Sequence, residues 1–213
     1  MDDTETCLHA GATASAPALL LRPWRPRDAA GLAEVYGDPV MRRWSNVTMD
    51  DEADAQRWVR EQRRGRRTGE RLAFAVLEVG SGGGEGRVAG HVVLKAPHGP
   101  SPEVGYWTAA HARGRGVASR ALGALTEWAF TAFPGLTRLT LLHQVDNTAS
   151  CRVAEKTGYV FDGVLLAAPP EFPLDGHVHV RVRGEGDGPA GHARQGRTAP
   201  AVGPRAVTPS APA

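Results

Sequence analysis

A stretch of arginines and glycines, "HARGRGVASRAL" from His111 to Leu122, has the composition of an anion-binding turn. Gly114 and Gly116 lack a Cβ and let successive backbone N–H groups converge on one point. The segment that follows has helical spacing, so the positive end of a helix dipole would face the same point. The residues favour a phosphate or pyrophosphate ligand. A glycine turn that only begins a surface helix is the alternative interpretation.

Two common nucleotide-binding motifs do not fit this stretch. A P-loop needs a Lys-Ser or Lys-Thr pair after its glycines, and none follows here. A dinucleotide fingerprint needs a third glycine where Ser119 stands, and it opens a β-α-β unit, whereas this stretch follows three expected strands. The residues alone therefore indicate a phosphate-bearing ligand without specifying which.

Two segments together resemble the GNAT family of N-acetyltransferases. "RGRGVA" from Arg113 to Ala118 resembles the family signature R/Q-x-x-G-x-G/A, and "DNTASCRVAEKTGYVFDG" from Asp146 to Gly163 resembles its N-x-x-S/A-x-x-x-x-E-K-x-G-F/Y segment. The resemblance covers Leu19 to about Arg183 and is closest to the branch of ribosomal-protein N-terminal (Rim-type) acetyltransferases. It implies acetyl-CoA as the donor and direct attack by the acceptor amine in a ternary complex.

The resemblance also implies which residues hold the donor. Backbone N–H groups from Gly114 to Ser119, with Arg113 or Arg115 beside them, would hold the pyrophosphate. The strand end at Tyr106–Ala109 would offer peptide groups to the pantetheine, because in this fold that strand splays from its neighbour. Asn147 would contact pantetheine or CoA, with a plain helix N-cap as the alternative. The expected donor-binding residues are Tyr106, Trp107, Thr108, Arg113, Gly114, Arg115, Gly116, Val117, Ala118, Ser119 and Asn147.

Acetyl transfer to an amine needs a base for the ammonium and a proton for the departing thiolate. Glu103, at the start of "EVGYW", is the expected base, with a solvated surface acid as the alternative. Ser150 stands where this branch has a serine, so Ser150 or water is the expected proton donor. Many relatives have a tyrosine four residues further on, where this sequence has Ala154. A CoA-binding regulatory module without turnover is therefore the alternative from another functional class.

No residues show the sequence spacing of a metal site, so we expect no metal. Cys7 and Cys151 are the two cysteines and are expected to be free thiols in a reducing compartment. His143 shares strand parity with two leucines and is expected to be a core histidine. His177 and His179 share one face of the last strand, where they border either the acceptor cleft or a solvated edge.

Composition limits the class of partner. The 213 residues include 25 Lys and Arg against 23 Asp and Glu, so net charge does not favour a nucleic acid partner. The basic run "RWVREQRRGRRTGER" suits a solvated helix C-terminus, with contact to an acidic acceptor or RNA as the alternative. No signal peptide or membrane-length apolar segment stands out, so we expect a cytoplasmic protein without a membrane partner. We expect a monomer or homodimer that acts on a peptide amine or on a small-molecule amine such as an aminoglycoside.

Hydrophobic periodicity predicts the elements that position these residues. The pattern is β-α-α-β-β-β-α-β-α-β-β, which is typical of an α/β fold with one mixed, mostly antiparallel sheet of about seven strands and helices on both faces. Residues 1–17 are expected to form a disordered leader. In residues 184–213, 18 of 30 positions are Gly, Ala or Pro, so a disordered tail is expected there. One GNAT domain would then span residues 18–183. Helices are expected at 27–38, 51–67, 117–133 and 147–157.

Overall fold

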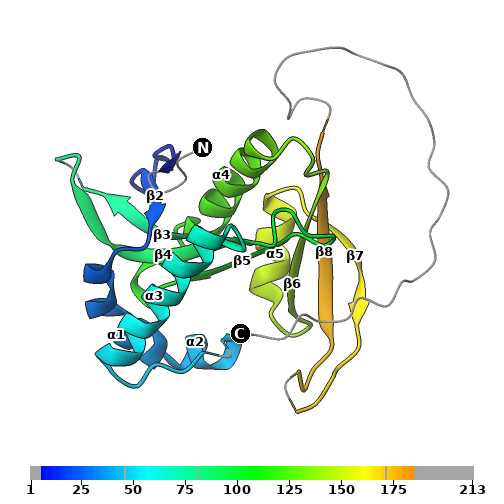
Figure 1. Ribbon diagram of the computed structural model, residues 1–213, viewed down its shortest axis with the longest axis horizontal. Coiled ribbons are helices and arrows are strands. Elements are labelled where there is room, and N and C mark those ends of the chain that lie inside the picture. The colour runs from blue at the N-terminus through cyan, green and yellow to red at the C-terminus, as the bar shows by residue number, and fades with distance from the viewer. Residues whose placement is uncertain (1–5, 46, 81, 171, 185–213) are drawn as a thin grey trace.

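The computed structural model describes residues 6–45, 47–80, 82–170 and 172–184 (Figure 1). Its strands are β1 (Leu8–Ala10), β2 (Leu19–Pro23), β3 (Arg71–Val79), β4 (Glu85–Lys95), β5 (Glu103–Thr108), β6 (Arg138–Gln144), β7 (Val160–Leu165) and β8 (Gly176–Val182). Its helices are η1 (Pro26–Gly31), α1 (Leu32–Gly37), α2 (Pro39–Trp44), α3 (Glu52–Thr68), η2 (Ala110–Ala112), α4 (Val117–Ala132) and α5 (Thr148–Lys156).

The strands form one open sheet in the order β1-β2-β3-β4-β5-β6-β8-β7. Every neighbouring pair is antiparallel except β5 and β6, which run parallel across the connection through α4. This is the mixed, mostly antiparallel α/β sheet that the sequence predicts. Within the described residues the sheet has eight strands where about seven were expected, because a short strand lies in the segment expected to be a leader.

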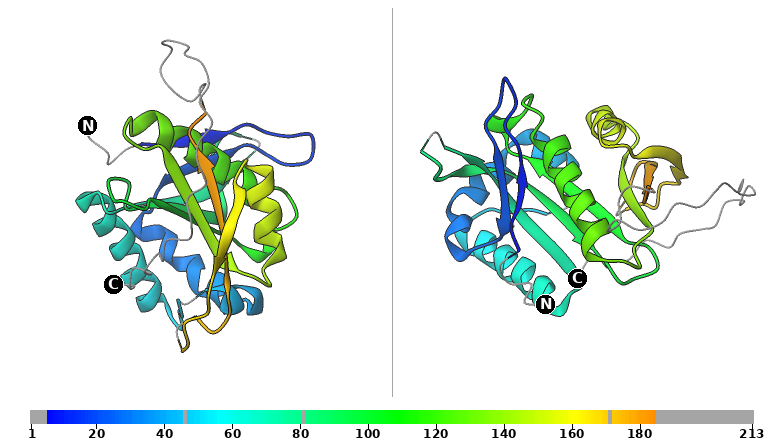
Figure 2. Two further views of the ribbon diagram at one scale, coloured as in Figure 1. Left: turned by 90° about the vertical axis from the view of Figure 1, so that its right-hand side faces the viewer. Right: turned by 90° about the horizontal axis from the view of Figure 1, so that it is seen from above.

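Helices cover both faces of the sheet, as the pattern predicts. The right-hand view of Figure 2 shows α3 and α4 on opposite sides of β3, β4 and β5. Strand alternation divides β5 between the two cores: Val104 and Tyr106 pack on the α4 side, and Trp107 packs on the α3 side. Each site residue of β5 described below therefore faces either α4 or α3.

The first residues that the structure describes correct the expected leader. Leu8 is only 8% exposed and packs in the core beneath α4. The Arg120 guanidinium donates to the backbone oxygens of Gly11 and Pro17, each at 2.6 Å. A strand of three residues is too short to show a periodic pattern, so its burial against α4 could not be predicted. The expected disordered tail at 184–213 lies, apart from Gly184, outside the described residues.

Helix α3 carries the basic run. Its N-cap is Asp51, whose side chain accepts from the Asp54 backbone N–H at 2.9 Å. Gly69, at φ 72°, ends the helix in the left-handed region. Arg66 alone among the late arginines is buried, over the Phe74 ring, and the others face solvent. The described helices include none with the length and apolar character of a membrane span.

Candidate active site

A wedge opens between the two parallel strands at the centre of the sheet. β5 and β6 pair only at Glu103 with Thr140 and at Val104 with Leu141, and beyond these residues the strands diverge (Figure 1). From Gly105 to Thr108, β5 keeps its ladder with β4 but has no ladder partner on the β6 side. Peptide groups that face a gap of this kind need a ligand or water as partner. The expected splay is therefore present, with Tyr106, Trp107 and Thr108 along it.

The glycine turn lies directly after this strand, at the N-terminus of α4. Gly114 and Gly116 adopt φ 76° and 69°, in the left-handed region that favours glycine. Gly116 is the N-cap of α4 and brings no capping side chain, because it has none. The first helix-internal bond runs from the Arg120 N–H to the Gly116 carbonyl at 3.0 Å. The N–H groups of Val117, Ala118 and Ser119 precede that bond and face the turn, which is the arrangement that binds a phosphate.

The two arginines of the turn are engaged with acids. The Arg113 guanidinium lies 2.5 Å from the Asp38 carboxylate and holds the pKa of that carboxyl below its usual value. The Arg115 guanidinium lies 2.9 Å from Glu78 and also donates to the backbone oxygen of His111 at 3.0 Å. Backbone N–H groups are therefore the free anion-binding groups of the turn, and a pyrophosphate contact by either arginine stays a prediction.

Asn147 is the N-cap of α5. Its Oδ1 accepts from the Ser150 backbone N–H at 3.2 Å, as in an ordinary helix N-cap. The cap fixes the first turn of α5 and with it the position of the Ser150 side chain. Contact between Asn147 and CoA stays a prediction.

Ser150 lies beside the side chain of Tyr106, an arrangement that the sequence did not reveal. Ser150 is 9% exposed, and the buried Tyr106 hydroxyl has no hydrogen-bond partner among the described residues. Burial raises the pKa of Tyr106 to about 12, while the nearby Ser150 side chain lowers it in part and Cys151 raises it. The Tyr106 hydroxyl therefore stays protonated at neutral pH. Ala154, where many relatives have a tyrosine, is fully buried in the core.

Glu103 stands at the closed end of the wedge, on the opposite face of β5 from Tyr106. Strand alternation turns its side chain toward the α3 face, where Trp107 also packs. Its carboxylate is ion-paired with the Lys95 ammonium of β4. Glu103 is therefore an engaged carboxylate at the strand start, and Lys95 must release it before it takes a proton. Its role as base stays a prediction.

One histidine on this face is excluded as a base by its surroundings. His91 is buried, and its Nδ1 accepts from the indole N–H of Trp24 at 3.1 Å. Burial lowers the pKa of His91 to about 3, so the ring is neutral and already occupied. It belongs to an aromatic cluster with Trp24, Trp58 and Trp107.

The remaining histidines and one cysteine gather on β6, β8 and α5. His143 is half-buried in this cluster, whereas the sequence predicted a core histidine. His177, His179 and Cys151 lie with it, although nothing in their sequence spacing indicated a common site. Burial lowers the pKa of His143 and of His179, and neighbouring imidazoles lower both further. Both cysteines are free thiols, as expected.

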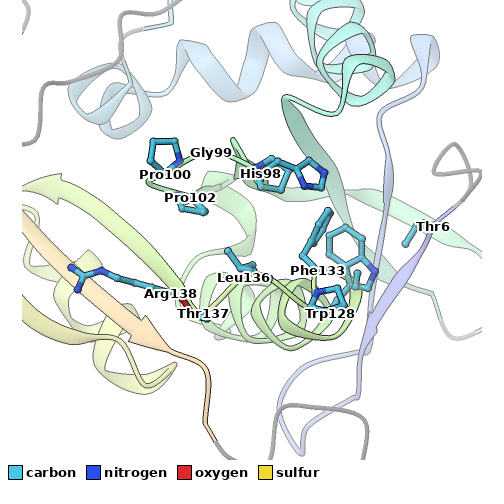
Figure 3. Close-up of a pocket in the computed structure, with 14 residues that line it drawn as sticks. Thr6, His98, Gly99, Pro100, Pro102, Trp128, Phe133, Leu136, Thr137 and Arg138 are labelled. Carbon is cyan, nitrogen blue, oxygen red and sulfur yellow. The ribbon is translucent and has the colours of Figure 1, made fainter. Parts of the chain in front are cut away.

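An open pocket of about 700 Å³ lies at the other end of α4 (Figure 3). Its wall includes Trp128, Phe133 and Leu136 from the end of α4 and the following loop, and the His98 ring packs edge-on against Phe133. None of the expected donor or catalytic residues lines it. The polar groups that suit acetyl transfer converge on the wedge, so the wedge is the candidate active site.

Comparison with known proteins agrees with this geometry. Residues 18–160 match the acetyltransferase (GNAT) domain family. Similar solved structures include the microcin C7 self-immunity acetyltransferase MccE in complex with acetyl-CoA and AMP, which is 17% identical (TM-score 0.68), with 80% of this chain and 98% of that chain covered. Another is Mycobacterium smegmatis RimJ in complex with CoA-disulfide, which is 23% identical (TM-score 0.68), with 84% and 86% covered.

A third similar structure is RimL, a ribosomal alpha-N-protein acetyltransferase in complex with coenzyme A. It is 19% identical, with 77% of this chain and 93% of that chain covered and a TM-score of 0.67. None of the curated proteins matches the chain significantly. At these identities the solved structures establish the fold, and the family match establishes the family. The chain belongs to the GNAT family of acetyltransferases and uses acetyl-CoA as its acetyl donor.

Proposed function

We propose that this acetyltransferase modifies the N-terminal amine of a protein or peptide by direct attack on acetyl-CoA in a ternary complex. The observation that carries the proposal is the wedge between β5 and β6, which leads directly into the glycine turn at Gly114 and Gly116. A thioester donor needs both parts: a diphosphate anchor and a strand edge along which its pantetheine amides can pair.

The donor's place follows from these two parts. Acetyl-CoA supplies an activated acetyl group, and the N–H groups of Val117, Ala118 and Ser119 hold its diphosphate at the α4 N-terminus. The free peptide groups from Gly105 to Thr108 pair with the pantetheine. This places the thioester toward the closed end of the wedge, and a β5 N–H there polarises the thioester carbonyl.

Proton transfer then occurs on the two faces of β5. Glu103, released from Lys95, takes the ammonium proton on the α3 side, directly or through water. On the α4 side the departing thiolate meets the Ser150 hydroxyl, with the Tyr106 hydroxyl next to it. Tyr106 restores the hydroxyl that Ala154 does not provide, so loss of the usual tyrosine is compatible with turnover.

A protein acceptor is supported by the similar structures that act on ribosomal proteins, RimL among them. The second candidate is a small-molecule amine, and the similarity to MccE, whose structure holds acetyl-CoA and AMP, favours testing it. The alternatives differ in the acceptor and share the donor site. One assay therefore compares them.

The test measures thiol release from acetyl-CoA with a panel of peptides with free N-termini, the same peptides blocked at the N-terminus, and small amines including aminoglycosides. Mass spectrometry then locates the added acetyl group. Preference for free N-termini over blocked peptides and small amines supports the proposal. Turnover confined to small amines overturns the choice of acceptor, and tight acetyl-CoA binding without any turnover indicates a regulatory module.

The proton donor is tested with Ser150→Ala, Tyr106→Phe and the double variant. Each substitution removes one hydroxyl from the pair beside the thiolate, so we expect each single variant to retain part of the rate and the double variant to lose more than either. Acetyl-CoA affinity measured by calorimetry controls for lost binding. A double variant with the wild-type rate would assign the proton to water.

A further inference from the structure

Four side chains from three separate elements converge beside the wedge. They are His143 on β6, His177 and His179 on β8, and Cys151 on α5. Each offers one ring nitrogen or sulfur atom, and these atoms all lie within 4.8 Å of one another. The Phe161 ring of β7 packs against both β8 histidines, with centroids 5.2 and 5.8 Å apart. We name these four residues the His-Cys cluster.

The separations within the His-Cys cluster approach those of a tetrahedral metal site. The Cys151 Sγ lies 3.6 Å from His143 Nε2 and 3.4 Å from His177 Nδ1. With zinc–sulfur bonds of about 2.3 Å and zinc–nitrogen bonds of about 2.0 Å, tetrahedral angles place sulfur and nitrogen about 3.5 Å apart. Two edges of the tetrahedron are therefore close to the expected length, and the remaining pairs of ligand atoms lie within 4.8 Å of one another.

The hydrogen bonding of His143 leaves the correct nitrogen free. Its Nδ1 lies 2.8 Å from the Gln144 backbone oxygen, which can only accept, so Nδ1 carries the proton. The Nε2 lone pair then faces Cys151. A histidine ligand that donates its second N–H to a backbone carbonyl is the usual arrangement around a protein metal.

His179 gives an independent reason to expect a ligand. It is 3% exposed, and neither ring nitrogen makes a hydrogen bond of good geometry among the described residues, although the Tyr159 backbone lies near the ring. A buried polar atom without a partner costs about 1–3 kcal/mol. One of the two nitrogens belongs to the set of converging atoms, so a cation at the centre would satisfy it. The other three members are half-buried, which leaves a route for an ion from solvent.

We propose that the His-Cys cluster is a zinc-binding site. Three imidazoles and one thiolate form a nitrogen–sulfur ligand set that suits Zn²⁺, while Mg²⁺ and Ca²⁺ prefer oxygen ligands that the cluster does not contain. On binding, the Cys151 thiol releases its proton to solvent and its sulfur coordinates the ion. The bound ion joins α5 to β6 and β8 immediately beside Ser150. The proposal does not depend on the identity of the acceptor.

The first experiment uses the full chain, stripped of metal under reducing conditions. Titration with Zn²⁺ in competition with a chromogenic chelator gives stoichiometry and affinity, and Co²⁺ reports geometry and ligand type. We expect one ion per chain, a tetrahedral cobalt spectrum in the visible range, and a sulfur-to-cobalt charge-transfer band in the near ultraviolet. A cobalt spectrum without that band, or no binding in competition with the chelator, would overturn the proposal.

Variants then locate the ion. Cys151→Ser and His177→Gln change half-buried members and are expected to weaken Zn²⁺ binding at least tenfold, and Cys151→Ser also removes the charge-transfer band. Cys7→Ser and His98→Gln, which change exposed residues of the same types outside the cluster, are the matched controls and should bind as wild type does. Circular dichroism verifies folding of each protein. Weakening in the controls and not in the cluster variants would place the ion elsewhere and contradict the site.

Discussion

Replacing Gly116 by alanine tests whether the turn holds the donor through its backbone. Gly116 has φ 69°, and an added Cβ would meet nothing closer than the Ser119 hydroxyl at 3.7 Å. The variant therefore introduces no collision, and the whole effect comes from backbone conformation. Because the residue is exposed and no packing holds it, we expect the free turn to relax out of the left-handed region.

The expected size follows from the cost of that conformation. A non-glycine residue in the left-handed region costs about 1–2 kcal/mol. Binding must restore the conformation so that the N–H groups from Val117 to Ser119 face the diphosphate again. A free-energy cost of this size raises the dissociation constant for acetyl-CoA about 5- to 30-fold.

Gly123→Ala is the matched control. Gly123 lies inside the same helix, has no positive φ and leaves room for a Cβ, so alanine there should stabilise the fold by about 0.5–1 kcal/mol. Calorimetry with acetyl-CoA and urea unfolding are run on both variants. If Gly116→Ala binds acetyl-CoA as tightly as Gly123→Ala, the backbone cradle is not the donor anchor and the reasoning fails.

Three further substitutions have defined outcomes. Glu103→Gln should lower turnover at least tenfold with unchanged acetyl-CoA affinity, and an unchanged rate would remove it from the mechanism. Arg113 lowers the pKa of Asp38 in the folded protein below its ordinary value of 3.8. The ionised carboxylate therefore stabilises the fold fully above pH 3.8, and this contribution is lost as the pH falls through the lower pKa of the folded state. In urea unfolding, the free energies of unfolding of wild type and Asp38→Asn should converge as the pH falls below 3.8. A difference between the two proteins that stays constant with pH would contradict this prediction. Leu8→Ala should lower the free energy of unfolding by about 2 kcal/mol, whereas His9→Ala, at an exposed position, should lower it by about 0.5 kcal/mol or less. Thermal unfolding measures both, and equal effects would show that β1 does not contribute to the core.

The glycine turn and the start of α4 could be predicted from sequence because the residues that form them are local. Gly114, Gly116 and the start of α4 are consecutive, so one short motif specifies the conformation and the exposed N–H groups together. Asn147 and Ser150 likewise stand one helical turn apart. Motifs of this kind carry their geometry in their spacing.

Contacts between distant segments could not be predicted in the same way. Tyr106 meets Ser150 only because α5 packs on the same face of the sheet as that residue of β5. Lys95 meets Glu103 through the β4–β5 register. The strand parity of Tyr106 with Val104 was a usable signal for its face. No sequence signal indicated which helix would cover it.

The His-Cys cluster shows the same limit for metal ligands. His143, His177 and His179 come together through the β6–β8 pairing, in which His143 lies opposite His177 and Leu141 opposite His179. Cys151 reaches them from α5. Spacing along the chain detects a metal site when its ligands share a loop or helix, and these ligands share neither.

A crystal structure of the chain with CoA would locate the donor directly. We expect the diphosphate on the N–H groups of residues 114–119 and the pantetheine paired along Gly105–Thr108, with its sulfur near Ser150 and Tyr106. CoA bound instead in the pocket beside Trp128 and Phe133, with the wedge filled by water, would contradict the assignment of the active site.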